Sequence, residues 1–177
     1  MNYQSKNPES LAQIPSIVYD ESDINYQVPL GWCYGDQTGS IALYSAGKVL
    51  QNEKLMEQAI AIAVKTTERD TVVKASRSEL TDAGLCHGMA GVAFLHKTWY
   101  QITGDERFYD QYNYFKNQVL KRGNHNDSIS GFKKYMGEED GHIDAIGLLD
   151  GSCGIGVFLI DSILESNLDW GELFLLK

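Results

Sequence analysis

Apolar residues recur at helical spacing in several parts of this chain. In residues 53–65 they return every three or four positions along one face (Leu55, Met56, Ala59, Ile60, Ala63 and Val64). This periodicity is typical of an amphipathic helix. A shorter pattern precedes it in residues 40–50, where Thr38 or Ser40 is a candidate N-cap. The two segments together predict a helical hairpin.

A second hairpin is predicted farther along the chain. Two apolar stripes with helical spacing lie on either side of the sequence Thr103-Gly104-Asp105 (Val92, Leu95, Trp99 and Ile102 before it; Phe108, Tyr112, Phe115 and Val119 after it). Gly104 suits a helix C-cap, and Asp105 suits the N-cap of the helix that follows. The break therefore joins two helices.

The segments outside these helices are rich in turn-forming residues. Residues 1–30 contain all three prolines, which obstruct regular hydrogen bonding, and are expected to form an irregular lead-in that drapes over the fold. Residues 66–81 are predicted to be a loop. Residues 123–142 are predicted to be a long loop with a short strand pair around residues 132–136. The folded domain is thus expected to cover residues 31–177.

A third helical pattern begins after another glycine-rich loop. Residues 147–156 carry that loop, and the helix that follows has an apolar face (Ile155, Phe158, Leu159 and Ile163). The last stretch, residues 169–177, is mostly apolar and is expected to dock on the core.

The glycine loops that precede the three helical patterns form an internal repeat. Residues 88–91 align with residues 151–154 as Gly-x-x-Gly, and residues 35–39 match with one extra residue, which gives unit lengths of about 53 and 63 residues. Each unit reads glycine loop, helix, loop, helix. Such hairpins bury their apolar faces only by stacking on neighbours. We therefore expect an all-α fold, as a bundle, solenoid or closed ring, with the loops collected at one end.

Composition and charge narrow the class of protein. The 177 residues are 43% hydrophobic and 22% charged, which is typical of a globular domain. The net charge is −9 and the basic residues form no stripe, so nucleic acid is not an expected partner. No stretch approaches the ~20 apolar residues of a membrane span, and residues 1–15 contain no apolar signal segment. We expect a cytoplasmic protein whose contact with membranes, if any, is indirect.

Cysteine and histidine usage points to a metal. Three cysteines, an odd number without a secretion signal, argue against a disulfide framework. Cys86 and His87 are adjacent between glycines, and Cys33 lies in a similar loop about 53 residues upstream. Two thiolates and one imidazole fit zinc, whose catalytic sites commonly have three protein ligands and an open fourth position. The alternative is that Cys86 is a small buried hydrophobe and His87 a hydrogen-bonded polar residue.

Other polar residues near the loops are weaker candidates for a role at the metal site. Asp36, Asp82 and Asp150 could each orient a ligand, although a capping or turn role is the simpler expectation. Cys153 is expected to pack inside the start of the third helix. His96 is expected to be a hydrogen-bonded histidine beside the apolar stripe of its helix.

Three motifs together resemble the lanthionine synthetase C family, the cyclases of lanthipeptide biosynthesis and their LanC-like relatives. They are Trp32-Cys33-Tyr34-Gly35, Cys86-His87-Gly88 and Gly147-Leu148-Leu149-x-Gly151-x-x-Gly154-Ile155, and the resemblance runs from about residue 29 to the end of the chain. It implies an α/α toroid of two concentric rings of helices, of which this chain would form the C-terminal part. It also implies that Cys33, Cys86 and His87 hold zinc.

The resemblance implies a reaction as well. A cysteine thiol of a dehydrated precursor peptide would take the open zinc position and add to a dehydroalanine or dehydrobutyrine, which closes a thioether ring. Tyr34 matches a family tyrosine, so the resemblance implies that it is the proton donor near the metal. The family's acid/base His and Asp lie in a portion that this sequence does not contain, and Pro29 stands where the family often has an arginine.

Two hypotheses of different classes follow. In the first, the chain is a zinc-dependent thioether cyclase, or the C-terminal part of one, completed by a missing N-terminal segment or partnered by a dehydratase. In the second, it is a non-catalytic zinc-bearing helical module that binds a peptide or a thiol such as glutathione. A glycoside hydrolase is a weaker third interpretation, because helical toroids also serve that class, but no suitable carboxylate pair stands out. The end repeats of a solenoid need polar caps, and the first helix has only the 30-residue lead-in to cover it. We therefore also expect an exposed apolar flank, dimerisation or a missing partner segment.

Overall fold

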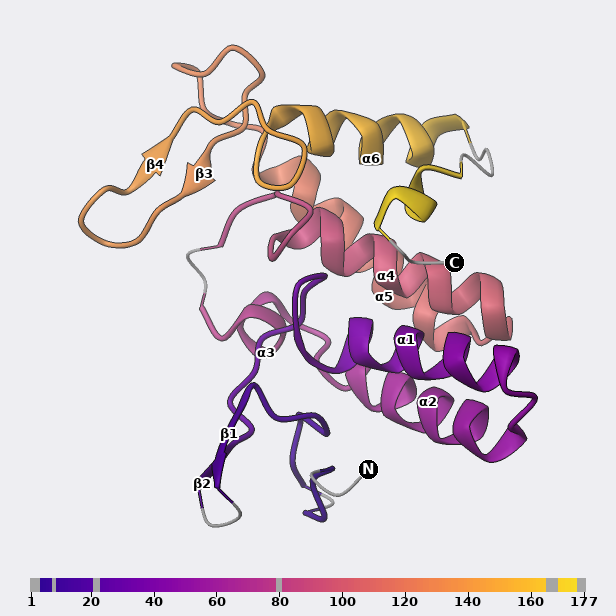
Figure 1. Ribbon diagram of the computed structural model, residues 1–177. Coiled ribbons are helices and arrows are strands. Elements are labelled where there is room, and N and C mark those ends of the chain that lie inside the picture. The colour runs from indigo at the N-terminus through magenta and orange to yellow at the C-terminus, as the bar shows by residue number, and fades with distance from the viewer. Residues whose placement is uncertain (1–3, 8, 21–22, 79–80, 165–168, 175–177) are drawn as a thin grey trace.

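Helices dominate the structure, a computed structural model that describes residues 4–7, 9–20, 23–78, 81–164 and 169–174 (Figure 1). In chain order the elements are β1 (Ile17–Asp20), β2 (Asp23–Asn25), α1 (Gly35–Val49), α2 (Glu53–Thr66), α3 (Val72–Ser76), α4 (Met89–Thr103), α5 (Glu106–Lys121), β3 (Lys134–Tyr135), β4 (His142–Ile143), α6 (Ser152–Leu164) and the 3-10 helix η1 (Asp169–Phe174). The predicted all-α class is confirmed.

Two helical hairpins and one further long helix pack side by side. α1 pairs with α2, and α4 pairs with α5, as the apolar stripes predicted. α4 contacts α1 on one side and α6 on the other, so it is the central element of the arrangement (Figure 1). The first helices of the three repeat units thus lie next to one another in chain order.

Capping residues set the ends of the second hairpin where the sequence predicted them. Gly104 ends α4 in the left-handed conformation with φ 69°, which glycine adopts without steric cost. The Asp105 side chain then accepts a hydrogen bond from the backbone N–H of Arg107 at 3.0 Å, so it caps α5.

The start of α1 differs from the prediction. The helix begins at Gly35 rather than near Ser40, and its N-cap is Tyr34, which makes no side-chain capping bond. Thr38 Oγ1 instead donates to the carbonyl oxygens of Gly31 and Trp32, and Ser40 Oγ donates to that of Gln37. The prediction was wrong because the helix begins in the glycine loop itself, so both hydroxyl residues lie inside the helix.

Two segments expected to be irregular contain short regular elements. In the lead-in, Ile17 pairs with Asn25 and Val18 with Ile24 in an antiparallel β1–β2 ladder. In the predicted loop 66–81, α3 forms because the Thr71 side chain accepts from the N–H of Lys74 at 3.2 Å.

The long loop between α5 and α6 contains one strand pair. β3, which lies inside the predicted range 132–136, pairs in antiparallel fashion with β4 (Lys134 with Ile143, Tyr135 with His142). The partner strand β4 falls outside that range.

The hydrophobic core is built around α4. Trp99 is fully buried and lies 6.0 Å from the ring of Phe108 and 5.6 Å from that of Tyr44, measured between centroids. The predicted stripes of α4 and α5 supply further large core side chains (Val92, Leu95, Phe115 and Val119). Burial of these apolar surfaces is the main force that holds the hairpins together.

The third unit differs from the first two after its first helix. α6 is followed by the six-residue η1 and not, within the described residues, by a long second helix. The ring of Trp170 in η1 lies 4.1 Å from that of Phe94, so this part of the tail docks on α4 as expected.

Apolar side chains are exposed on α6, which packs on α4 as α1 does, whereas the expected flank was the one beside the first helix. Ile160, Ile163 and Leu164 are 52%, 76% and 60% exposed. Among the described residues, none of the helices has the length and apolar composition that a membrane crossing requires.

The repeated glycines allow the same close approach of helix and loop backbone in the second and third units. A Cβ on Gly91 would overlap the carbonyl oxygen of Leu85, and one on Gly154 would overlap that of Leu148. The backbone bonds match too, since Met89 and Ser152 each donate to the carbonyl seven residues back, at 3.1 and 2.9 Å. The Gly-x-x-Gly alignment made from sequence therefore corresponds to one repeated backbone structure.

Candidate metal centre

Cys33, Cys86 and His87 come together where the glycine loops meet. One ligand atom from each, the two sulfurs and a ring nitrogen, lies within 4.8 Å of the other two. Cys33 lies just before α1, while Cys86 and His87 lie just before α4. In the part of the chain that the structure describes, this is the one group of three such side chains.

Backbone hydrogen bonds hold the three loops in register. The N–H of Trp32 donates to the carbonyl oxygen of Cys86 at 2.8 Å, and the N–H groups of Leu85 and Cys86 donate to that of Leu149 at 2.8 and 2.9 Å. Gly31 permits the first approach, because a Cβ there would lie 3.1 Å from the Cys86 oxygen. Cys86 and His87 are thus carried on irregular backbone that hydrogen bonds hold in place, as the flanking glycines predicted.

The site is open to solvent. Cys33 is exposed, and Cys86 and His87 are half-buried. A cavity of about 190 Å³ adjoins the ligands and is lined by Tyr34, His87 and Tyr135 among others. A small group such as a cysteine side chain can therefore approach from this cavity.

The local environment keeps the Cys86 thiol protonated in the absence of a metal. Burial is the largest of the causes that together raise its pKa to about 12, and the hydrogen bond and negative charge of Cys33 and the charge of Asp150 act in the same direction. The positive charge of Lys134 opposes the rise. A cation that replaces these protons would remove the repulsion between two neighbouring thiolates.

Tyr34 stands beside the ligands with its proton firmly held. Burial, followed by the negative charges of Cys33 and Cys86, raises the pKa of its hydroxyl to about 12. The phenol is therefore a proton donor throughout the neutral range.

Asp150 lies next to His87, the candidate histidine ligand. Its Oδ1 is 4.0 Å from His87 Nδ1, and its Oδ2 accepts a hydrogen bond from Lys134 Nζ at 2.9 Å. Of the three aspartates, Asp150 is the one whose carboxylate lies close to the His87 ring, where it could orient that side chain. The third glycine loop thus supplies a supporting carboxylate, although it carries no ligand.

The other two aspartates bind backbone groups, and Asp82 has the expected turn role whereas Asp36 does not. Asp82 accepts from the N–H of Gly84 at 2.9 Å and from that of Tyr135 at 3.1 Å. This second bond ties β3 to the loop that holds Cys86. Asp36 binds the lead-in and a buried arginine.

Lys134 and Tyr135 are site residues that the sequence reasoning missed. Both lie on β3, about 50 residues after Cys86 and His87 in the sequence. They reach the site because β3 folds back over the second glycine loop. The predicted strand was the one available signal, since a lysine and a tyrosine in a polar loop have no distinguishing spacing.

Two minor predictions were wrong. Cys153 is exposed rather than packed, because it projects from the outer side of α6 while Gly154 and Ile155 face the core. His96 is fully buried, but neither ring nitrogen has a hydrogen-bond partner. It stacks on Phe115 at a centroid distance of 5.8 Å and an interplanar angle of 4°, so it acts as an apolar ring.

The donor set fits zinc. At Zn–S distances of about 2.3 Å and Zn–N distances of about 2.0 Å, ligand atoms in a tetrahedral site lie roughly 3.3–3.8 Å apart. The three atoms here lie within 4.8 Å of one another, so side-chain rotation is enough to reach that spacing. Two soft sulfurs and an imidazole also suit zinc better than magnesium or calcium, which prefer oxygen.

The structure is thus a set of stacked helical hairpins with a Cys, Cys, His group, which could hold a metal ion, at the loop end. The family model described as "Lanthionine synthetase C-like protein" matches residues 2–175, and the chain therefore belongs to that family. The resemblance found in the three sequence motifs is thus confirmed.

A solved structure similar in fold is that of nisin cyclase. It superposes with a TM-score of 0.57 at 18% sequence identity, over 90% of this chain and 34% of the other. The chain therefore spans about a third of the length of nisin cyclase. The similarity supports the prediction that the hairpins form part of an α/α toroid.

Proposed function

We propose that this chain carries the metal centre of a zinc-dependent cyclase, which joins a peptide cysteine to a dehydroalanine or dehydrobutyrine through a thioether bond. The observation that carries the proposal is the meeting of Cys33, Cys86 and His87 within 4.8 Å at a place open to solvent. Membership of the lanthionine synthetase C-like family supports it. The substrate would be a dehydrated precursor peptide.

The three ligands would hold zinc as two thiolates and one imidazole, which leaves a fourth position for a substrate group. Bound zinc would supply the positive charge that favours the thiolate form of a cysteine thiol near neutral pH. Asp150 would orient His87 from 4.0 Å, and Lys134 would hold Asp150 in turn.

Ring closure requires a proton to be handled beside the ligands. The peptide sulfur forms a bond to the β-carbon of the dehydro residue, and the double-bond electrons shift to give an enolate. A proton then arrives at the α-carbon, so the product is an isomer of the substrate. Tyr34 is suited to deliver that proton, because this residue lines the adjoining cavity and its hydroxyl stays protonated at neutral pH.

A second candidate function is thiol binding without turnover. The exposure of Cys33 and the adjoining cavity favour it, because an open site admits a small thiol such as glutathione as readily as a peptide. This function needs the three ligands but no proton donor. Tyr34 therefore separates the two candidates.

Alkylation of free thiols tests the cyclase proposal, because ring closure does not change the mass of the peptide. A dehydrated precursor peptide is incubated with the zinc-loaded protein and then treated with an alkylating reagent. We expect the wild-type chain to protect the peptide cysteines and Cys86→Ala to lose this protection. Cys153→Ala, at an exposed cysteine outside the ligand group, is the matched control. Thiol binding without protection would support the second candidate and exclude the first.

A further inference from the structure

A buried ion pair lies directly behind the first ligand loop. Asp36 and Arg69 are 1% and 2% exposed, and the guanidinium Nη2 is 3.6 Å from the carboxylate Oδ2. Asp36 is in the first turn of α1, three residues after Cys33. Arg69 follows the end of α2, so the pair also connects the two helices of the first hairpin.

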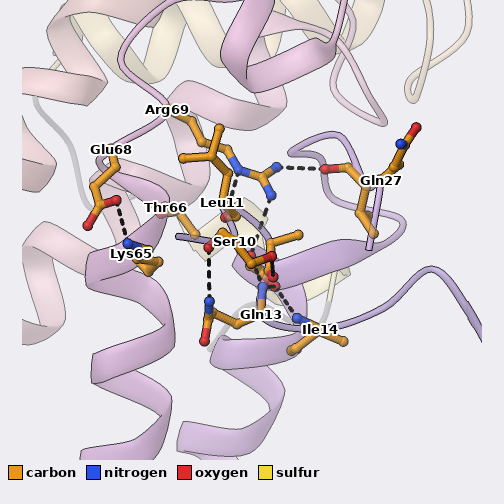
Figure 2. Close-up of polar contacts among 12 residues, drawn as sticks. Ser10, Leu11, Gln13, Ile14, Gln27, Lys65, Thr66, Glu68 and Arg69 are labelled. Atoms are coloured by element: carbon orange, nitrogen blue, oxygen red, sulfur yellow. Dashed lines mark hydrogen bonds and ion pairs between the residues drawn. The ribbon is translucent and has the colours of Figure 1, made fainter. Parts of the chain in front are cut away.

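The pair binds backbone groups from both sides of the β1–β2 hairpin. The Asp36 carboxylate accepts from the N–H groups of Gln13 and Ile14 at 2.9 and 2.6 Å. Arg69 donates to the carbonyl oxygens of Leu11 (3.0 Å) and Val28 (2.7 Å). Figure 2 shows Arg69 and its neighbours Leu11, Gln13 and Ile14 gathered at this point. We call residues 11–14 the lead-in strap.

The same pair fixes both ends of the segment that carries Cys33. Val28, at one end, is bound to Arg69, and Asp36 is at the other end. Between them, the N–H of Leu30 donates to the carbonyl of Ala75 at 2.7 Å. Gly35 turns the chain with φ +80°, a conformation that residues with a side chain rarely adopt. The ligand loop is therefore held at points on each side of the cysteine.

Stability alone does not explain such a pair. A buried ion pair is often no more stabilising than well-packed apolar residues, because both charges lose their hydration. The carboxylate and the guanidinium instead fix the position of the backbone, since together they bind four separate backbone groups from two chain segments. The segment they fix is the one that brings the first sulfur to the other two ligands.

We propose that Asp36, with Arg69, is a positioning residue for the metal ligand Cys33, and that the lead-in strap is part of the metal site's support. This inference rests on the proposed zinc site. Supporting residues of this kind usually change metal affinity by about 10–100-fold when they are replaced. Asp36→Asn would remove the charge and one acceptor oxygen while keeping the side-chain shape.

Titration of the chain with cobalt(II) tests the proposal. Cobalt(II) bound by thiolates gives a charge-transfer absorption whose intensity rises with the number of sulfur ligands. We expect one cobalt(II) per wild-type chain with the intensity of two thiolates. Asp36→Asn should weaken cobalt(II) binding by about 10–100-fold and lower this intensity towards that of one thiolate.

Asp161→Asn is the matched control. Asp161 is 2% exposed and pairs with Lys97 at 2.7 Å, but it lies on α6 outside the ligand group. The variant should lose thermal stability as Asp36→Asn does and keep the wild-type cobalt spectrum. If Asp36→Asn does not fold, Arg69→Lys provides a second test. Lysine keeps the positive charge but cannot donate to Leu11 and Val28 as the guanidinium does, so this variant should also weaken cobalt(II) binding.

The outcomes separate the two proposals. Asp36→Asn or Arg69→Lys with wild-type cobalt affinity and spectrum would overturn the positioning role and leave the metal site intact. A wild-type chain without a two-thiolate spectrum would overturn the metal site itself and the positioning role with it.

Discussion

The backbone N–H of Trp32 donates to the carbonyl oxygen of Cys86 at 2.8 Å, and the same bond recurs one repeat later between Leu85 and Leu149. The two bonds join equivalent positions of successive glycine loops. The arrangement of the metal ligands is therefore a consequence of how the repeats stack. The first two loops each place a cysteine at the shared position, and the third places Leu149 there.

Gly91→Ala is expected to destabilise the protein and to disturb the ligand loop. An added Cβ would overlap the carbonyl oxygen of Leu85, the residue before the ligand Cys86, so the backbone must shift. We expect a loss of about 1–3 kcal/mol or more in the free energy of unfolding, measured by denaturant titration.

Gly156→Ala provides the control for that variant. Gly156 lies in α6, and a Cβ there would meet nothing within 4 Å. Because alanine is the better helix former, this substitution should stabilise the chain by about 0.5–1 kcal/mol. Equal effects of the two variants would contradict the close contact at Gly91.

The stability of the fold should depend on pH through His96. Burial lowers the pKa of His96 from 6.5 to about 3, so between these values the unfolded chain binds a proton that the folded chain does not. The free energy of unfolding is therefore unaffected by His96 protonation above pH 6.5. It falls by about 1.4 kcal/mol per pH unit as the pH is lowered from 6.5 towards 3.

His96→Phe isolates that contribution. Phenylalanine keeps an aromatic ring against Phe115 but does not titrate. The difference between the unfolding free energies of the two proteins, measured from pH 7 to pH 4, should grow as the pH is lowered. A difference that stays constant with pH would show that His96 is not held neutral in the folded state.

Tyr34→Phe should separate catalysis from metal binding. The hydroxyl is not a ligand, so the zinc content should be unchanged. If Tyr34 delivers the proton, ring closure should slow by about 10²-fold or more. Tyr109→Phe, on an exposed tyrosine of α5, serves as the control. An unchanged ring-closure rate in Tyr34→Phe would remove this residue from the proposed reaction.

Asp150→Asn should weaken the metal site without removing it. The substitution takes away the charge 4.0 Å from His87 Nδ1 and the partner of Lys134. We expect zinc affinity to fall by about tenfold, as measured by competition with a chelator. Asp140→Asn, at an exposed turn position, should leave the affinity unchanged, and equal affinities in both variants would contradict the orienting role.

The sequence predicted those parts of the structure that depend on local pattern. The stripes around Trp99 and Phe115 predicted α4 and α5, because a helix that buries one face must repeat every 3.6 residues. Gly104 and Asp105 predicted their ends, since caps act within a few residues. The adjacent Cys86 and His87 also predicted the loop, because neighbouring side chains on a helix point about 100° apart and the flanking glycines permit irregular backbone.

The remaining features depend on contacts between distant segments. Asp36 meets Gln13 and Ile14 over 23 and 22 residues, and nothing in the local sequence marks this partnership. Lys134 reaches the site only because β3 folds over the second loop. The unpaired nitrogens of His96 were missed for the same reason, since its surroundings are set by tertiary packing.

The zinc content of the purified chain tests the central proposal most directly. We predict one zinc per wild-type chain by elemental analysis, with the metal lost in Cys33→Ala and Cys86→Ala and retained in Cys153→Ala. Such a result would place the metal on the three side chains that lie within 4.8 Å of one another. A wild-type chain that binds no zinc, or a Cys86→Ala variant that keeps a full equivalent, would contradict it.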